Sequence, residues 1–223
     1  MRINEIFESI SGEAGFFPQG SWCTFIRLQG CNLRCRWCDT LKAQDPEKGK
    51  EYTIEKLVNI VKALGNSRVL ITGGEPLCQL TDLRALVERL VKLLDCSIQI
   101  ETNGSFPIPI IPYGNTDWVV DYKLPSSGYA VGEVHDAFQY TLLDRDIAII
   151  KFVLAPTESD IKAMLDEMIN IGPYYNRPFL ISPLGANGDV IPKVAKRISD
   201  EAGREMLDRA VFSLQIHRLI GMA

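Results

Sequence analysis

The sequence has only two histidines, His135 and His217, which excludes a histidine-rich metal site. It also lacks any apolar run near the roughly 20 residues that a membrane-spanning helix needs, so we expect no membrane segment. An excess of positive charge is missing as well, because 24 Lys and Arg stand against 28 Asp and Glu, a net charge of −4. A nucleic-acid groove requires a basic face. We therefore expect a small-molecule substrate and no nucleic-acid partner.

The first thirteen residues, MRINEIFESISGE, are mixed and acidic and lack the basic and apolar parts of a signal peptide. We therefore expect a cytoplasmic protein, in which thiols stay reduced. In that setting, grouped cysteines indicate a metal before they indicate a disulfide. Three of the six cysteines fall within one short stretch.

Apolar runs alternate with helical patterns along the 223 residues, and no linker divides them. This alternation is typical of an α/β domain with a mostly parallel sheet, here a single domain over residues 1–223. The predicted strand runs are 22–30, 68–74, 97–104, 117–125, 147–156, 178–185 and 210–217.

Four helices are predicted between these runs. The first covers 54–64 with Thr53 as its N-cap, and the second follows Thr81 over 83–94. Thr157 and Asp160 read as a capping-box variant that opens a third helix. A fourth covers 191–208, although Gly203 weakens its middle.

Polar or glycine-rich groups follow nearly every predicted strand. Active sites of barrel-like α/β folds form where the carboxyl ends of the strands converge, so we expect these groups to share one site. They are 30–31, 72–75, 101–104, 121–123, 182–183 and 215–217.

Cys31, Cys35 and Cys38 form a C-x-x-x-C-x-x-C motif directly after the first predicted strand. Three such thiolates can each bind one iron of a 4Fe–4S cluster, and the fourth iron then stays open for a ligand. The alternative is a structural zinc site completed by Cys78, Cys96 or a histidine. Zinc sites usually combine two paired C-x-x-C units, and this sequence has one.

The cysteine motif, together with Thr72-Gly-Gly-Glu-Pro76 after the next strand, resembles the radical S-adenosylmethionine superfamily. The resemblance implies that the open iron binds the amino and carboxylate groups of the cofactor's methionine part. Glycines in the second motif let backbone groups approach that amine, and Glu75 can accept a hydrogen bond from it.

Five further segments resemble the 7-carboxy-7-deazaguanine synthases: 5–13, 25–35, 37–40, 121–127 and 215–217. This resemblance implies a partial, abbreviated TIM-like (β/α) barrel of about six mostly parallel strands in a homodimer. It also implies a carbon–nitrogen lyase that converts 6-carboxy-5,6,7,8-tetrahydropterin to 7-carboxy-7-deazaguanine with loss of ammonia, a precursor for queuosine and other deazapurines. Flavodoxin or ferredoxin is the implied electron donor.

The same resemblance implies a set of site residues. For the pterin substrate they are Ile10, Ser11, Gly12, Arg27 and Thr72. For S-adenosylmethionine they are Trp37, Cys38, Asp39, Gly74, Glu75, Lys123 and Ser182. Thr40 would bind a magnesium ion, which prefers oxygen ligands.

Arg27 has a physical rationale of its own, because it lies inside the apolar stretch TFIRL, where an idle arginine is unexpected. We expect a substrate carboxylate to be its partner, bound through the planar guanidinium. Cys23, Cys78 and Cys96 are expected to be buried small hydrophobes. Two other functions stay open at this point: an activase of a glycyl-radical enzyme, and a zinc-stabilised binding module without catalysis.

Overall fold

One nine-stranded sheet organises the chain in the computed structural model, which describes residues 1–130, 133–134, 148–186 and 188–221. The strand order is β3-β1-β2-β4-β5-β6-β7-β8-β9. The bounds are β1 Arg2–Ile10, β2 Trp22–Leu28, β3 Lys50–Glu51, β4 Arg68–Gly73, β5 Ser97–Thr102, β6 Thr116–Tyr122, β7 Ala148–Leu154, β8 Phe179–Pro183 and β9 Ala210–Phe212. Strands β2 and β4 to β9 run parallel, whereas β1 is antiparallel to both of its neighbours. Within the described residues no pairing joins β3 to β9, so the sheet is open.

The α/β class and the mostly parallel sheet are confirmed, and a strand overlaps each of the seven predicted runs. The sheet nevertheless has more strands than the expected six or so. The sequence reading missed β1, in which polar and apolar residues do not alternate regularly, and the two-residue β3. The last run is also shorter than predicted, because β9 ends at Phe212 and α7 begins at Ile216.

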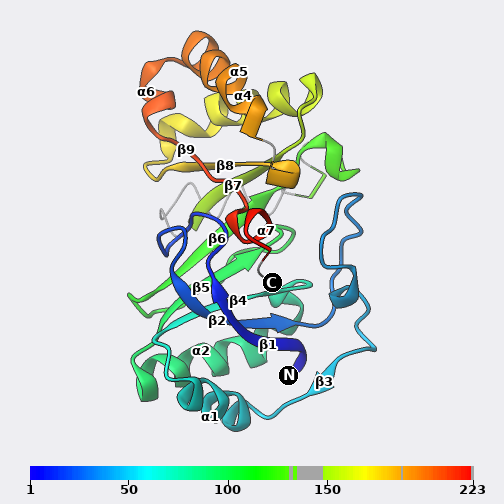
Figure 1. Ribbon diagram of the computed structural model, residues 1–223, viewed down its shortest axis with the longest axis vertical. Helices are drawn as coiled ribbons and strands as arrows, with labels where there is room; N and C mark the ends of the chain where they lie inside the picture. Colours follow the sequence, from blue (N-terminus) through cyan, green and yellow to red (C-terminus); the bar gives the residue numbers. More distant parts are fainter. Residues whose placement is uncertain (131–132, 135–147, 187, 222–223) are drawn as a thin grey trace.

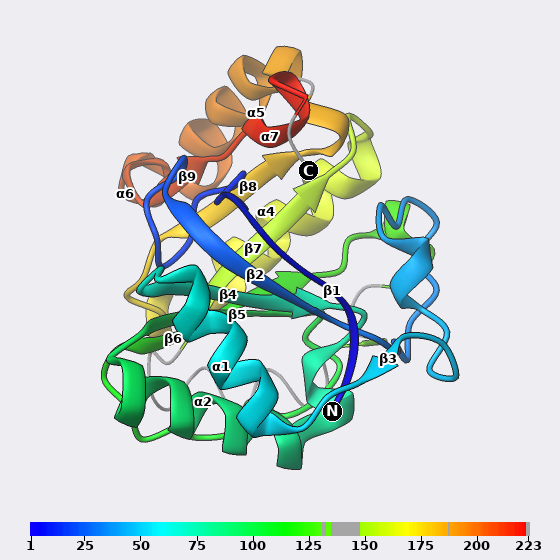
Figure 2. The same cartoon turned by 60° about the horizontal axis from the view of Figure 1, so that its bottom comes forward.

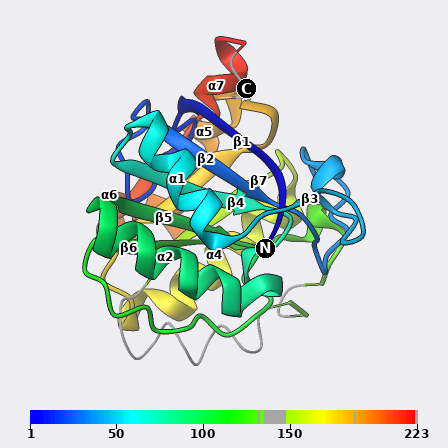
Figure 3. The ribbon, with the colours of Figure 1, turned by 90° about the horizontal axis from the view of Figure 1, so that it is seen from below.

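Helices pack at both ends of the sheet (Figure 1). Near β2, β4 and β5 lie α1, Ile54–Leu64, and α2, Leu80–Leu94. Near β8 and β9 lie α4, Glu158–Ile171, α5, Ile191–Arg197, and α6, Arg204–Asp208. Figure 2 shows the same two groups of helices from another side. In Figure 3, which is seen from below, α1 and α2 lie side by side in front of the sheet. In the part of the chain that the structure describes, no helix is long and apolar enough to cross a membrane.

Two of the predicted helix starts are confirmed. The side chains of Thr53 and Thr157 accept hydrogen bonds from backbone amides three residues later, which satisfies one free donor at each helix start. The predicted start near Thr81 is wrong, because a 3-10 turn at Pro76–Gln79 leads directly into α2 at Leu80. The fourth predicted helix is interrupted at Gly203, whose φ of +93° is a left-handed conformation.

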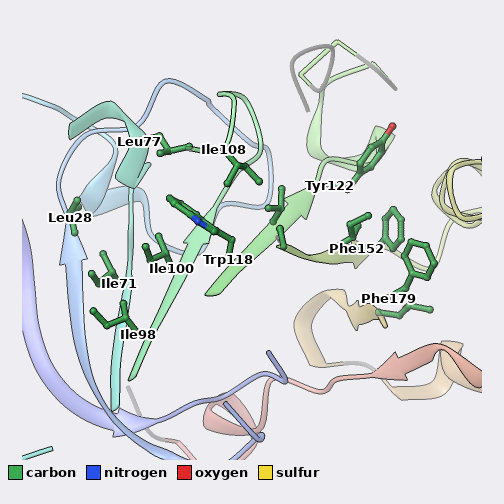
Figure 4. Close-up of a cluster of buried hydrophobic side chains, with 14 of the residues drawn as sticks. Leu28, Ile71, Leu77, Ile98, Ile100, Ile108, Trp118, Tyr122, Phe152 and Phe179 are labelled. Atoms are coloured by element: carbon green, nitrogen blue, oxygen red, sulfur yellow. The ribbon is translucent and has the colours of Figure 1, made fainter. Parts of the chain in front are cut away.

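Alternate residues of the parallel strands point to opposite faces of the sheet. One face is apolar along its whole length: in Figure 4, Ile71, Ile98, Ile100 and Trp118 lie together in the main core. On the other face, Val119, Ile149 and Leu180 form an apolar layer with Ala14. Two residues closer to the carboxyl ends of the same strands, this face carries polar and charged side chains, and these lie at the site.

Candidate functional site

A cavity of about 600 Å³ lies at the carboxyl ends of the parallel strands. It is large enough for a nucleoside-type cofactor together with a second small molecule, given that ligand pockets are typically about 300–1,000 Å³. All but two of the residues implied for the site line it. Those that line it are Ile10, Ser11, Gly12, Arg27, Thr72, Cys31, Cys35, Cys38, Trp37, Asp39, Thr40, Gly74 and Lys123. The other two, Glu75 and Ser182, are buried next to it.

The cysteine loop begins directly after β2. Cys31, Cys35 and Cys38 are free thiols and partly exposed to the cavity. Within the described residues, no three His, Cys, Asp or Glu side chains converge on one point where they could hold a single ion. Thiolates that each bind a different iron of a cube do not need to converge in this way. The three cysteines lie on one loop and open to one cavity, so each could bind a separate iron of a 4Fe–4S cluster.

Burial raises the pKa of the Cys31 and Cys35 thiols. Because metal ligands must be deprotonated, loading of the site releases protons. Cys23 and Cys96 are buried, as predicted, but the prediction for Cys78 is wrong. Cys78 is exposed because it lies in the surface turn before α2.

Two glycines at the end of β4, Gly73 and Gly74, bring the second motif against the cysteine loop. A Cβ atom on Gly74 would lie 2.0 Å from the carbonyl oxygen of Gly30, and one on Gly73 would lie 2.3 Å from the backbone of Leu28. Gly73 also has a φ of +132°. The Glu75 amide donates to the Gly30 oxygen at 2.8 Å. The glycines are therefore required by this close backbone packing, whatever else they contact.

Glu75 is fully buried, and its carboxylate is already used within the protein. It accepts hydrogen bonds from the Leu77 amide at 2.9 Å, the Thr102 hydroxyl at 2.7 Å and the Asn103 amide at 2.7 Å. Burial raises its pKa, although these three donors oppose that rise. Glu75 therefore joins the turn after β4 to the end of β5, and its expected contact with the cofactor's amine stays a prediction.

Arg27 has partners in the protein, which the sequence reading did not foresee. Its Nε donates to Glu5 Oε1 at 2.7 Å, and its Nη1 donates to Thr40 Oγ1 at 3.2 Å. The guanidinium also lies 5.6 Å from the centre of the Phe7 ring. Glu5 additionally binds Lys42 Nζ at 2.8 Å. Glu5 and Phe7 belong to β1, so the missed strand supplies the surroundings of Arg27.

The Glu5 carboxylate is held in its charged form. Burial opposes ionisation, but hydrogen bonds from Lys42 and Arg27 outweigh it and lower the pKa of Glu5. Arg27 and Lys42 thus share the Glu5 carboxylate at this end of the cavity, and both line it. Their guanidinium and ammonium groups can also donate to an anionic ligand group.

A second cluster of charged side chains lies deeper in the cavity, and the sequence reading did not predict it. Lys151 on β7 pairs with Glu13 at 3.1 Å, and Glu13 also accepts from Ser182 Oγ at 3.0 Å and Gln215 Nε2 at 2.8 Å. Glu101 on β5 accepts from Thr72 Oγ1 at 3.1 Å. The signal was present in the sequence, because a lysine within IAIIKFVL is as unexpected as an arginine within TFIRL.

The two acids of this group differ in their ionisation. Burial opposes the charge on Glu13, but Lys151, Gln215 and Ser182 outweigh it and lower its pKa. Burial raises the pKa of Glu101, and Lys151 offsets only part of that rise. Burial lowers the pKa of Lys151, but the negative charges of Glu13 and Glu101 raise it by more, so the pKa is raised overall. Acids whose environments separate their pKa values can play different roles in one site.

Trp37 and Lys123 meet above the cysteine loop. Lys123 Nζ lies 5.0 Å from the centre of the Trp37 ring and 2.7 Å from Asp121 Oδ2. The indole N–H donates to Ser126 Oγ at 3.1 Å, which fixes the plane of the ring. The Thr40 hydroxyl donates to Asp39 Oδ1 at 2.9 Å, so two side-chain oxygen atoms lie together at the cavity wall. Gln215 lines the same cavity, whereas His135 and the side chain of His217 lie outside the described residues.

Comparisons with known proteins agree with this site. A profile of the Radical SAM superfamily matches residues 25–112. The 7-carboxy-7-deazaguanine synthase of Clostridium acetobutylicum is 33% identical over 227 residues, which cover 98% of this chain and 95% of that protein. The enzyme of the same name from Hyperthermus butylicus is 47% identical over 109 residues, which cover 49% of this chain and 45% of its own.

A solved structure extends the similarity to three dimensions. The crystal structure of QueE from Escherichia coli matches with a TM-score of 0.69 at 26% identity and covers 95% of this chain and 92% of that one. The zinc-module and activase alternatives gain no support from these matches. The chain therefore belongs to the 7-carboxy-7-deazaguanine synthase family of radical S-adenosylmethionine proteins.

Proposed function

We propose that this protein converts 6-carboxy-5,6,7,8-tetrahydropterin to 7-carboxy-7-deazaguanine with loss of ammonia. The observation that carries the proposal is the composition of one cavity. The cavity is lined by three free cysteines, by Arg27 with its neighbour Lys42, and by the acids Glu13 and Glu101. The chain also matches a 7-carboxy-7-deazaguanine synthase over 98% of its length. The reaction class is that of a carbon–nitrogen lyase.

The cysteine loop would hold the 4Fe–4S cluster, and S-adenosylmethionine would bind beside it. When bound, this pair supplies a carbon radical able to abstract hydrogen from the substrate. Trp37, held by Ser126 and covered by Lys123, forms a rigid wall for the cofactor. Gly74 lines the cavity and packs on Gly30, so the proposed cofactor site adjoins the cysteine loop.

Arg27 and Lys42 would position the substrate carboxylate. Both donate to Glu5 and both line the cavity, where they could also donate to a ligand carboxylate. Asp39 and Thr40 provide oxygen atoms next to Arg27, and we propose this place for the magnesium ion, which typically keeps most of its waters and takes one or two protein ligands.

Glu13 and Glu101 lie deeper, where the rest of the pterin would reach. With its lowered pKa, Glu13 accepts hydrogen bonds, while Glu101, with its raised pKa, can hold or release a proton. Enclosure by the strands keeps water away from the reacting carbon. A low-potential one-electron donor such as flavodoxin or ferredoxin would reduce the cluster, and we propose a homodimer in the cytoplasm.

Anaerobic turnover tests the proposal. The reconstituted protein is mixed with the carboxylated tetrahydropterin, S-adenosylmethionine, magnesium and a reductant, and the deazapurine chromophore is followed by absorbance and mass. We expect the product to appear together with released ammonia. Iron and sulfide near four per chain with no product from this substrate would overturn the substrate assignment. Zinc near one per chain would overturn the whole proposal.

A further inference from the structure

Asn103 lies directly after β5, in the segment Glu101-Thr-Asn-Gly104, and is only 8% exposed. Its backbone amide donates to Glu75 at 2.7 Å, which fixes its main chain against the turn after β4. Its side chain reaches from there to the first cysteine of the loop. None of the roles given above uses this side chain.

The orientation of the Asn103 amide follows from its neighbours. Its Oδ1 accepts hydrogen bonds from the Ser105 backbone N–H at 3.0 Å and the Ser105 hydroxyl at 2.6 Å. A backbone N–H can only donate, so the atom that it meets must be the amide oxygen. The NH₂ group therefore faces the other way, toward Cys31 Sγ at 3.8 Å and Asn32 Oδ1 at 3.0 Å.

Cys31 thus receives a side-chain donor in addition to the Leu33 backbone N–H at 3.4 Å. Hydrogen bonds to the sulfurs of an iron–sulfur cluster are one of the factors that set its reduction potential. When an electron enters the cluster, negative charge on the sulfurs increases. A fixed N–H donor stabilises that reduced state more than the oxidised one.

We propose that Asn103 is a positioning residue that raises the reduction potential of the cluster by donating a hydrogen bond to Cys31 Sγ. The step concerned is the uptake of one electron from a low-potential donor, with no bond made or broken. The inference rests on the cluster assigned under the proposed function. It adds a residue outside the cysteine motif that controls how easily the cluster is reduced.

Asn103→Leu is the decisive variant, because leucine has a similar volume, offers no donor and leaves little space for water. Its backbone bond to Glu75 is retained. The measurement is a redox titration of the anaerobic holoprotein, followed by electron paramagnetic resonance. We expect at least a tenfold lower ratio of reduced to oxidised cluster at the wild-type midpoint, which for one electron corresponds to about 59 mV. Asn103→Ala should shift in the same direction but less, because a water can replace the amide.

Asn115→Ala is the matched control. Asn115 also uses its side-chain amide as a donor, to the Cys96 carbonyl at 2.7 Å, but it lies away from the cysteine loop. Its loss should leave the midpoint unchanged. The direction of the shift in midpoint potential separates loss of the hydrogen bond from a general loss of packing. Looser packing exposes the cluster to water, which stabilises the reduced, more negative state and would raise the midpoint.

An unchanged or higher midpoint in Asn103→Leu with full iron content would overturn the inference. Loss of iron from both Asn103 variants would also overturn it, because Asn103 would then hold the cluster together and not adjust its potential. Absence of iron and sulfide from the wild-type protein would instead defeat the proposed function, so the two failures are distinguishable.

Discussion

Arg27 contacts Glu5, Thr40 and the Phe7 ring and lines the cavity. Arg27→Lys keeps the charge but loses the planar fork. We expect the carboxylated tetrahydropterin to bind about 1–3 kcal/mol more weakly, the range for a charge-assisted hydrogen bond. An analogue without the carboxylate should lose little affinity, as measured by equilibrium dialysis under nitrogen.

Glu5→Gln provides the control for this prediction. It removes the protein's own anion and leaves Arg27 and Lys42 in place, so binding of the carboxylated ligand should not weaken. If Arg27→Lys weakens both ligands equally, Arg27 serves only as the partner of Glu5.

The cysteines give a second test at this scale. Alanine at Cys31, Cys35 or Cys38 should abolish the cluster, because each thiolate would bind a separate iron. Alanine at Cys78 or Cys96 should leave iron content and the visible absorbance unchanged. Cys78 is the more demanding control, since it is exposed and its thiol interacts electrostatically with Cys31. Iron loss in Cys78→Ala would mean a fourth protein ligand and no open iron.

At the scale of elements, the contact between β7 and the loop after β1 depends on Lys151 and Glu13. Lys151→Met would leave Glu13 as a buried carboxylate without its cation. We expect a loss of about 3–5 kcal/mol in the free energy of unfolding, measured with urea. Lys151→Met combined with Glu13→Gln should recover much of that loss.

Lys162→Met is a matched control on α4. Lys162 also pairs with an acid, Asp166 at 2.8 Å, but both side chains are exposed. Its effect should stay below about 0.5 kcal/mol. A small effect of Lys151→Met as well would mean that water reaches Glu13 freely.

Glu13 also predicts a pH dependence. Its pKa in the folded protein lies below the ordinary value of 4.5, so its stabilisation is present above that value. It is lost as the pH falls through the lower, folded pKa. Glu13→Gln should therefore flatten the decline of the unfolding free energy below pH 4.5. Glu101 has a raised pKa, so its ionisation lowers the unfolding free energy at pH values above 4.5 and does not mask the effect. If urea titrations of Glu13→Gln show the same decline below pH 4.5 as the wild type, this assignment is contradicted.

The elements differ in how far the sequence predicts them. The parallel strands are dense in β-branched and apolar residues, and each was found, as were the helices after Thr53 and Thr157. Strand β1 was not, because RINEIFESI is half polar and its polar and apolar residues do not alternate regularly. The partners of Arg27 were missed for the same reason. Chain-distant contacts such as Lys151 to Glu13 require the sheet order, which no local pattern contains.

At the scale of the whole molecule, one apolar core cluster extends from Ile3 on β1 to Ile198 after α5. We therefore predict that the chain unfolds as one domain. Thermal scans of the anaerobic protein by far-ultraviolet and near-ultraviolet circular dichroism should give coincident single transitions. Two separated transitions would divide the chain into independent units.

The close packing of Gly74 on Gly30 has a consequence for the order of events during folding. The cysteine loop gains its final shape only when β4 has paired with β2, since the Gly30 carbonyl then meets the Glu75 amide. A chain still lacking that pairing presents its thiols on an unconstrained loop. Stable iron incorporation therefore cannot precede assembly of the central strands. The time course of iron incorporation gives an upper limit for the time that this step of folding takes.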